Sequence, residues 1–331
     1  MIRENNIDNI KILLLFTVAF AHNLIPFKNE SKIIEFAIKF IYLFHMPLFT
    51  FCTGYLVRKS KRNVWKYIKK LLIPYIVFQL LYMVIGAAMI QLGIIDYSTD
   101  TMKISIVEPS GPLYFLICMV FWRMLYPTFD HIKANKIIVL VSMAIGAALL
   151  SLDKASNTMI LPCFALLPFF YAGSILDDES LGKLRDIFAK NPWYLFLLGG
   201  GYIILALIVP YDIILFRANA WNLDTALMFT LALKLLYYII AFLGGAVIIG
   251  AIPRKNIGRI TQKASNGMVI YIGSSFLSPY LYIILYHMCP ILGSSLLLNS
   301  VCIFIFTIVT IVFLSWNRWT QFYEFIFERF I

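Results

Sequence analysis

The chain alternates long apolar runs with short polar connectors along its whole length. About ten runs have the roughly 17 to 25 apolar residues that a helix needs to cross a bilayer. They lie at 10–27, 33–57, 71–93, 110–127, 137–152, 159–176, 193–210, 225–250, 265–288 and 297–315. The pattern predicts an all-α integral membrane protein, a polytopic bundle of about ten transmembrane helices in which 1–331 form a single domain without a separate soluble part.

Composition agrees with this interpretation. The chain is 61% hydrophobic and 14% charged, with a mean hydropathy of +0.84. Soluble domains are typically about 45 to 50% apolar and about 25% charged. These values exclude a water-soluble globule.

The net charge of +11 is concentrated in alternate connectors. One set carries Arg58, Lys59, Lys61, Arg62, Lys66, Lys69, Lys70, Lys133, Lys136, Lys183, Arg185, Lys190, Arg254, Lys255, Arg259 and Lys263. The intervening connectors carry only Lys28, Lys32, Lys103, Lys154 and Arg217. Because positively charged connectors face the cytoplasm, both termini are expected there. Topology and contacts with anionic lipids account for the charge without a nucleic-acid partner.

Several familiar chemistries find no support in the sequence. The five cysteines form no C-x-x-C pair and read as buried, inert thiols. The four histidines show no ligand spacing, so no metal is expected. Gly199–Gly201 lie within an apolar run, where small residues indicate a close contact between helices.

Polar residues within apolar runs are costly and therefore need a reason. Lys11 and His22 lie eleven residues apart in the first run, about three helical turns, so both side chains share one face. Lys11 is expected near the cytoplasmic boundary and His22 deeper in the bilayer. They are interpreted as the wall of a polar cleft, or as a snorkelling lysine and a histidine bonded to a neighbouring helix.

The second run contains the segment FHMPLFTFCTGY, with His45 and Pro47 near its middle. Proline lacks a backbone donor, so we expect the helix to open near position 43. His45 then either lines the same cleft as His22 or is a hydrogen-bonded structural residue. Glu35 and Lys39, four residues apart in the same run, are expected to pair with each other, and Glu35 is also a candidate for the cleft or substrate-binding site.

Five segments carry a resemblance to a known family. They are K-x10-H in the first run, FHMPLFTFCTGYLVRKS, KYIKKLLIPY, GPLYFL and LLPFFYAG, in that order. Together they resemble the membrane-bound acyltransferase-3 family, in particular the fucose 4-O-acetylase-like and polysaccharide O-acetyltransferases. The resemblance covers at least residues 1–176 and implies a ten-helix enzyme of the bacterial cytoplasmic membrane. Its reaction would move an acetyl group from cytoplasmic acetyl-CoA to a sugar hydroxyl of a cell-envelope polysaccharide or glycolipid.

The resemblance also implies roles for individual residues. Lys11 and His22 match the family's first-run motif, and Lys66 and Lys69, with Lys70 adjacent, match its basic cluster before the third run. That cluster often contains arginines, and lysines offer point charges in place of a bidentate clamp. Ser274 stands where relatives often have histidine, so any role of that histidine is absent or supplied elsewhere.

The expected chemistry needs a base for the acceptor hydroxyl. A histidine held neutral by burial suits that task, either as general base or as a transient carrier of the acyl group. Lys66, Lys69 and Lys70 would hold the phosphates of CoA. Glu108 is interpreted as orienting an acceptor sugar or as an exposed carboxylate of a loop. Tyr114 is interpreted as an aromatic platform for sugar or pantetheine.

Two other functions remain open at this stage. One is a transporter or flippase of lipid-linked saccharides, in which Lys11 and His22 belong to a proton or substrate path. The other is an inactive scaffold subunit of a glycan-synthesis complex. The enzyme requires acetyl-CoA, a glycan acceptor and the lipid bilayer as partners, whereas a transporter would not bind acetyl-CoA.

Overall fold

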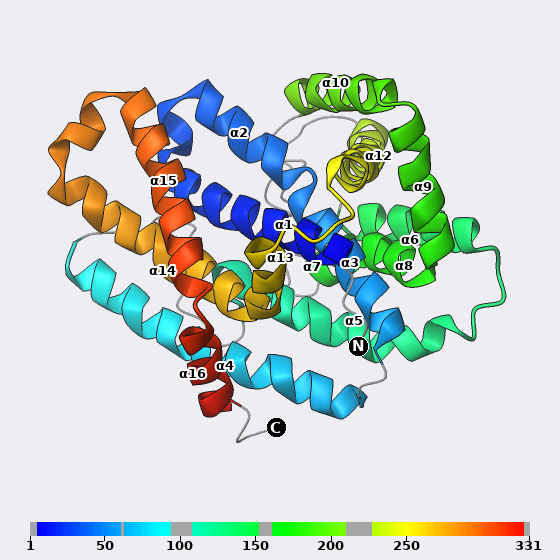
Figure 1. Ribbon diagram of the computed structural model, residues 1–331, viewed down its shortest axis with the longest axis horizontal. Coiled ribbons are helices and arrows are strands. Elements are labelled where there is room, and N and C mark those ends of the chain that lie inside the picture. The colour runs from blue at the N-terminus through cyan, green and yellow to red at the C-terminus, as the bar shows by residue number, and fades with distance from the viewer. Residues whose placement is uncertain (1–4, 61–62, 94–107, 152–160, 210–226, 328–331) are drawn as a thin grey trace. The chain divides into compact units, whose positions relative to one another are not determined.

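The computed structural model describes residues 5–60, 63–93, 108–151, 161–209 and 227–327, and every regular element in these ranges is helical (Figure 1). They belong to two compact units whose segments interleave along the chain. Unit 1 comprises Met1–Leu14, Glu35–Lys61 and Leu125–Ala264. Unit 2 comprises Leu15–Ile34, Arg62–Met124 and Ser265–Ile331. Helix α1 (Asn5–Leu24) begins in unit 1 and ends in unit 2.

The remaining helices divide between the two units. Unit 1 holds most of α2 (Lys32–Tyr42), together with α3 (His45–Lys59), α6 (Lys136–Leu150), α7 (Leu161–Ala165), α8 (Leu167–Ile175), α9 (Asp178–Lys190), α10 (Trp193–Ile208), α12 (Leu227–Ala251) and α13 (Arg259–Lys263). Unit 2 holds η1 (Ile25–Glu30), α4 (Val64–Gln91), η2 (Gly111–Leu113), most of α5 (Tyr114–Phe129) and of η5 (Ala264–Asn266), α14 (Gly267–Met288), η6 (Pro290–Ser294), α15 (Leu296–Leu314) and α16 (Asn317–Phe327).

The predicted all-α, polytopic membrane fold is confirmed. Among the described residues, 6 helical segments are long and apolar enough to cross a membrane, or up to 8 if each of two bent helix pairs is one span. Two shorter apolar helices, Lys136–Leu150 and Leu161–Ile175, add to these. The count of ten spans and the cytoplasmic termini stay predictions. Of the basic residues used to orient the chain, Lys61, Arg62, Lys103, Lys154 and Arg217 lie outside the described residues.

Three local features depart from or refine the pattern-based expectation. Helix α4 begins at Val64, earlier than expected, because the Asn63 side chain accepts a hydrogen bond from the backbone N–H of Trp65 and caps the helix. The segment around α14 bends by 42° between Ser275 and Leu277. Pro279 explains the bend, since its missing N–H leaves the carbonyl four residues earlier without a helical partner. The connector expected after the sixth run is itself a helix, α9.

The closest helix crossing in unit 1 joins α3 and α8. A Cβ added at Gly54 would overlap the carbonyl oxygen of Phe170, and a Cβ added at Gly173 would overlap that of Phe51. Only glycine at both positions lets the two backbones meet, which is how membrane helices gain packing contacts without a hydrophobic driving force. This crossing fixes the last turns of α3 beside the segment that leads into α9.

Of the three glycines expected at a close helix contact, Gly199 faces α12, where an added Cβ would lie 4.0 Å from the Val247 side chain. For Gly200 and Gly201 the prediction is wrong, because an added Cβ would meet no atom of the described residues within 4 Å. Helices α10 and α12 instead approach at Gly244, where an added Cβ would lie 2.6 Å from the ring of Tyr202. A run of small residues thus indicates where helices can approach, and the partner's large side chain decides where they do.

A buried lysine in unit 1 is satisfied by a helix end. Lys234 of α12 is fully buried, and its ammonium donates to the carbonyl and the hydroxyl oxygen of Ser151 at the end of α6. Carbonyl groups at the last turn of a helix lack helical donors and carry a partial negative charge. The lysine therefore has a structural role that ties α12 to α6.

In unit 2 a buried glutamine joins α4 to the start of α5. The Gln79 amide donates to the carbonyl of Glu108 over 2.9 Å, and its oxygen accepts from the backbone N–H of Ser110 over 2.9 Å. The Tyr271 hydroxyl of α14 donates to the carbonyl of Pro112 over 2.7 Å. The segment 108–112 is thus bonded from two helices. Gly111, with φ of +50°, adopts a left-handed conformation that favours glycine.

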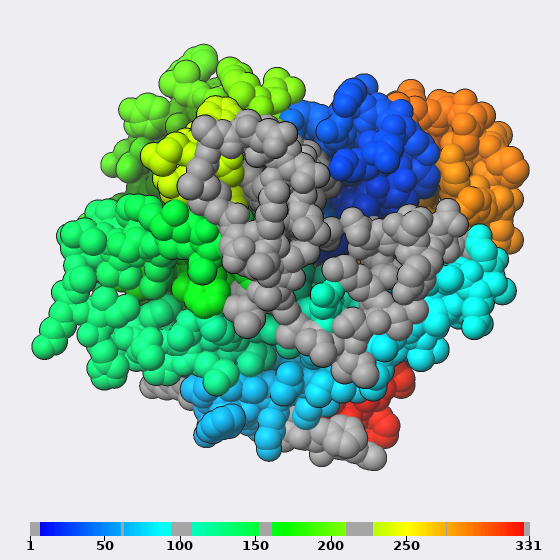
Figure 2. Space-filling view, turned by 180° about the vertical axis from the view of Figure 1, so that it is seen from behind, coloured from blue at the N-terminus to red at the C-terminus, as the bar shows by residue number. Residues whose placement is uncertain are grey.

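The outer surface of α4 is apolar over most of its length, and Figure 2 shows the helix, in blue to cyan, open to the outside. The exposed side chains include Leu72, Ile76, Leu80, Leu81 and Val84. They recur at helical spacing, as expected of a helix that faces lipid along one stripe. Apolar residues at these positions cost nothing where hydrocarbon is the solvent.

Candidate functional site

Helix α1 is anchored at its beginning by Asn9. The buried Asn9 amide donates to the carbonyls of Pro253 and Lys255 over 2.9 and 3.0 Å, and its oxygen accepts from the Thr261 hydroxyl over 2.6 Å. Lys11 lies one half-turn further on. Its ammonium is 3.4 Å from the carbonyl oxygen of Ala264 and 3.6 Å from the carboxylate of Asp8. Both contacts are long, so the charge of Lys11 is only weakly engaged.

The other end of α1 is anchored by Asn23, also buried. Its amide donates to the Thr307 hydroxyl of α15 over 2.9 Å, and its oxygen accepts from the Ser278 hydroxyl of α14 over 3.0 Å. Every polar atom of this amide that needs a partner in the membrane has one. The network belongs to unit 2 and fixes the backbone beside the residue that precedes it in sequence, His22.

His22 itself is half-buried in the last turn of α1. Within the described residues its ring makes no hydrogen bond, in contrast to Asn23 beside it, whose amide nitrogen and oxygen both have a partner. An imidazole held at a fixed place with its nitrogen atoms unengaged is free to exchange a proton with a bound molecule. The catalytic roles of His22 and Lys11 stay predictions.

His45 is the first residue of α3, and the predicted opening of the second span is confirmed there. Helix α2 ends at Tyr42, so residues 43 and 44 interrupt the span. The buried His45 Nδ1 is 2.8 Å from the carbonyl oxygen of Ile41, and its ring lies edge-on to Tyr42 at 4.7 Å. Pro47 falls in the first turn of α3, where a missing N–H costs little. These contacts give His45 a structural role, while a role in the cleft stays a prediction.

The three proposed acceptor-side residues are placed as follows. Glu35 is half-buried on α2; Lys39, its expected partner, donates to the carbonyl of Leu207 over 3.3 Å. Glu108 is half-buried, and its backbone carbonyl is held by Gln79 as described above. Tyr114 is the half-buried first residue of α5. A Glu35–Lys39 pair and sugar-binding roles for Glu108 and Tyr114 stay predictions.

The three predicted donor-site lysines lie in the first two turns of α4. Lys66 and Lys69 are exposed, whereas Lys70 is half-buried. They share the amino-terminal end of one helix, whose unpaired backbone N–H groups add partial positive charge. The three lysines thus lie within two turns of one helix, and their role as a CoA-binding group stays a prediction.

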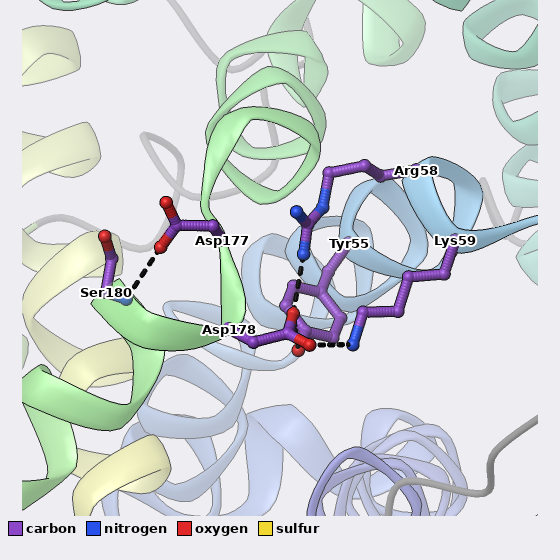
Figure 3. A network of polar contacts seen from close by, with 6 residues as sticks. All are labelled: Tyr55, Arg58, Lys59, Asp177, Asp178 and Ser180. Carbon is purple, nitrogen blue, oxygen red and sulfur yellow. Dashed lines mark hydrogen bonds and ion pairs between the residues drawn. The ribbon is translucent and has the colours of Figure 1, made fainter.

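A second basic group lies in unit 1 around Asp178, the first residue of α9 (Figure 3). Its Oδ1 accepts from the Tyr55 hydroxyl over 2.8 Å and from Arg58 over 2.7 Å, and its Oδ2 accepts from Lys59 over 2.7 Å. Hydrogen bonds from Lys59, then Tyr55 and Arg58, hold the pKa of Asp178 below its usual value. One carboxylate thus joins the end of α3 to the start of α9.

Asp177 completes the start of α9 as its N-cap. Its Oδ1 accepts a hydrogen bond from the backbone N–H of Ser180 over 2.7 Å (Figure 3). Hydrogen bonding by the Ser180 side chain, and next by this N–H, lowers the pKa of the Asp177 carboxyl. Sequence analysis counted Arg58 and Lys59 only as topology signals and passed over both aspartates. The adjacent Asp177 and Asp178 before a charged amphipathic segment were the available signal, since acidic residues favour the first turn of a helix.

The family of the chain follows from its sequence. A family model described as an acyltransferase domain, that of the acyltransferase-3 family, matches residues 4–317. The chain belongs to the acyltransferase-3 family. No curated protein and no solved structure matches it.

This membership gives the fold and the polar residues a coarse function. The acyltransferase-3 protein is a multi-pass membrane acyltransferase, and the matched range includes both anchored ends of α1 as well as α9. The match extends the resemblance found in the first half of the sequence over nearly the whole chain. The family match identifies an acyltransferase; the acyl donor, the acceptor and the roles of single residues belong to the proposal below.

Proposed function

We propose that this acyltransferase moves an acetyl group from cytoplasmic acetyl-CoA to a sugar hydroxyl of a cell-envelope polysaccharide or glycolipid, in a bacterial cytoplasmic membrane. The observation that supports it best is the state of His22. Its ring is half-buried and unbonded within the described residues, next to an asparagine that holds the helix in place. Such an imidazole has the position and freedom that an acyl-transfer base needs.

The proposed reaction has two variants that differ in what His22 bonds to. As general base, His22 accepts the proton of the acceptor hydroxyl while that oxygen attacks the thioester carbonyl carbon. The carbon–sulfur bond then breaks, and the proton passes to the departing CoA thiolate. As acyl carrier, a ring nitrogen attacks the thioester carbonyl carbon, the carbon–sulfur bond breaks, and CoA leaves as the thiol with the proton of the ring N–H. The sugar oxygen then attacks the acetyl carbon, the carbon–nitrogen bond breaks, and the hydroxyl proton returns to the imidazole. Both variants require the imidazole in its neutral form.

Other residues supply charge and positioning in this proposal. Lys11 contributes a weakly engaged positive charge on the same helix as His22. Lys66, Lys69 and Lys70 attract the phosphates of acetyl-CoA to the start of α4. His45, Glu35, Glu108 and Tyr114 are proposed to contact the acceptor or the pantetheine arm. No metal is needed, because the histidine and the thioester leaving group account for each proton and bond.

The test uses the full chain in lipid nanodiscs with radiolabelled acetyl-CoA and envelope glycan. Replacement of the base typically costs about two to four orders of magnitude in rate, so His22→Ala is expected to lose transfer to at least that extent while still binding acetyl-CoA. The matched control is His131→Ala, which removes an exposed histidine after α5. Full transfer by His22→Ala contradicts the role of His22, and a wild-type protein that binds no acetyl-CoA contradicts the donor.

A trapping experiment separates the two variants of the mechanism. Incubation with labelled acetyl-CoA without acceptor leaves label on the protein only if His22 carries the acetyl group. The label should then be absent from His22→Ala and should leave on addition of acceptor glycan. A wild-type protein that transfers label without retaining it supports the general-base variant.

A further inference from the structure

One buried charge in unit 1 has no counterpart. Arg185 lies on the inner face of α9 between Leu181 and Phe188 and is 3% exposed. Its Nε and both Nη atoms are buried and have no hydrogen-bond partner. A buried guanidinium is almost always paired, because taking it out of water without a partner costs several kcal/mol. Its five N–H donors therefore point to an absent acceptor.

The basic side chains near Arg185 each have a carboxylate partner, so those carboxylates are already occupied. Arg58 and Lys59 share Asp178, and Arg254 bonds Asp186 over 2.6 Å. Lys11 faces Asp8. Within the part of the chain that the structure describes, Arg185 is the basic side chain of this group without a carboxylate. The surplus positive charge calls for an anion from outside the chain.

The positive charges converge on two residues of α3. The charges of both Lys11 and Arg185 act on the thiol of Cys52, and those of Arg58 and Arg185 act on the hydroxyl of Tyr55. The Nε of Arg58 is also buried without a partner. Burial, with a smaller contribution from the charge of Arg254, lowers the pKa of Arg185 to about 10, so it stays charged at neutral pH.

We propose that Arg185 is the centre of an anion-binding site that takes a phosphate group between α9 and the last turns of α3. A guanidinium offers two parallel N–H groups to two phosphate oxygens, which lysines cannot do. If the proposed function holds, the phosphate is one of those of acetyl-CoA, and Arg185 offers it a bidentate contact of a kind that lysines cannot make. The other source of the same chemistry is the phosphate of a lipid headgroup.

The test measures binding separately from transfer. Full-length protein in nanodiscs of zwitterionic lipid is titrated with adenosine 3′,5′-bisphosphate, which carries the 3′-phosphate and the first 5′-phosphate of CoA and no thioester. Arg185→Met should weaken binding roughly ten- to hundredfold, because one charge-assisted bidentate contact is lost. Arg185→Lys should recover part of the affinity. Lys190→Met, which removes an exposed charge from the same helix, should bind as the wild type does.

A second arm distinguishes the sources of the phosphate. Wild type and Arg185→Met are melted in nanodiscs with and without anionic lipid, and again with inorganic phosphate. Stabilisation of the wild type alone by anionic lipid, with equal nucleotide affinity of both proteins, assigns the site to a lipid phosphate. Equal responses of the two proteins to nucleotide, lipid and inorganic phosphate overturn the site. Binding and melting are measured without acetyl transfer. The test of Arg185 therefore remains valid even if the protein proves not to be an acetyltransferase.

Discussion

The first turn and the middle of α9 treat positive charge in opposite ways. In its first turn, one aspartate satisfies Arg58, Lys59 and Tyr55 together, and the group is partly open to water. Two turns later Arg185 is more deeply buried and has no partner. Stability alone would favour the reverse arrangement, because a counter-ion matters most where water is absent. The contrast indicates that the first group holds α3 and α9 together, whereas Arg185 has donors left for the anion proposed above.

The largest effect is expected from a substitution that displaces α3, because α3 lies beside both Asp178 and Arg185 of α9. Gly54→Ala places a Cβ against the carbonyl oxygen of Phe170 and pushes α3 away from α8. Overpacking of this kind costs roughly 1–3 kcal/mol or more, so we expect a strongly lowered melting temperature and a loss of folded protein in detergent. Gly200→Ala, where a Cβ meets no atom of the described residues within 4 Å, is the matched control and should melt as the wild type does. Equal melting of the two variants contradicts the close crossing.

Smaller effects are expected from substitutions of Arg185 and Asp178, and the two should change stability in opposite directions. Arg185→Met removes buried donors without partners, which cost roughly 1–3 kcal/mol, so the protein without ligand should become more stable. Asp178→Asn weakens an exposed ion-pair network worth about 1 kcal/mol or less per pair and should make it less stable. Melting temperatures in zwitterionic nanodiscs measure both. A destabilised Arg185→Met would mean that the guanidinium already has a partner in the folded protein.

The smallest effect concerns the pH dependence of stability. The pKa of Asp178 is lowered in the folded state, so its stabilising contribution is fully present above the unfolded value of about 4 and is lost as the pH falls through the lowered value. Asp178→Asn should therefore show a flatter decline in melting temperature below about pH 4 than the wild type. Glu324→Gln, an exposed carboxylate of α16, serves as the control. Parallel melting profiles of wild type and Asp178→Asn would show that the Asp178 network does not contribute to stability.

Much of the fold was predictable from the sequence because hydrocarbon imposes a simple rule on each segment. A span must be long, apolar and helical, so the runs around α1, α4, α12 and α15 could be identified from hydropathy alone. The interruption before His45 followed from one proline. Caps were harder to predict: Asn63 extends α4 beyond its apolar run because a polar side chain at the boundary takes up a free N–H.

The site was predictable only where a motif named it. His22 and Lys11 came from spacing and resemblance, but the asparagines that fix α1 did not, because a buried amide reveals its purpose only through its partners. Gly54 and Gly173 matter through the backbone opposite them, which sequence does not show. Arg185 looked like any other topology signal. Its importance is that partners are missing, and only a three-dimensional arrangement shows a missing partner.

The turn between α9 and α10 has a consequence for where Arg185 meets its anion. The two helices are bent by 99°. If α10 runs along the bilayer normal, α9 lies nearly parallel to the membrane surface, as an interfacial helix with an apolar and a charged side. A guanidinium on the inner side of such a helix sits at the depth of lipid phosphates, where a soluble nucleotide and the headgroups compete for one charge. Lipid composition would then set the apparent affinity for the acyl donor without any change in the protein.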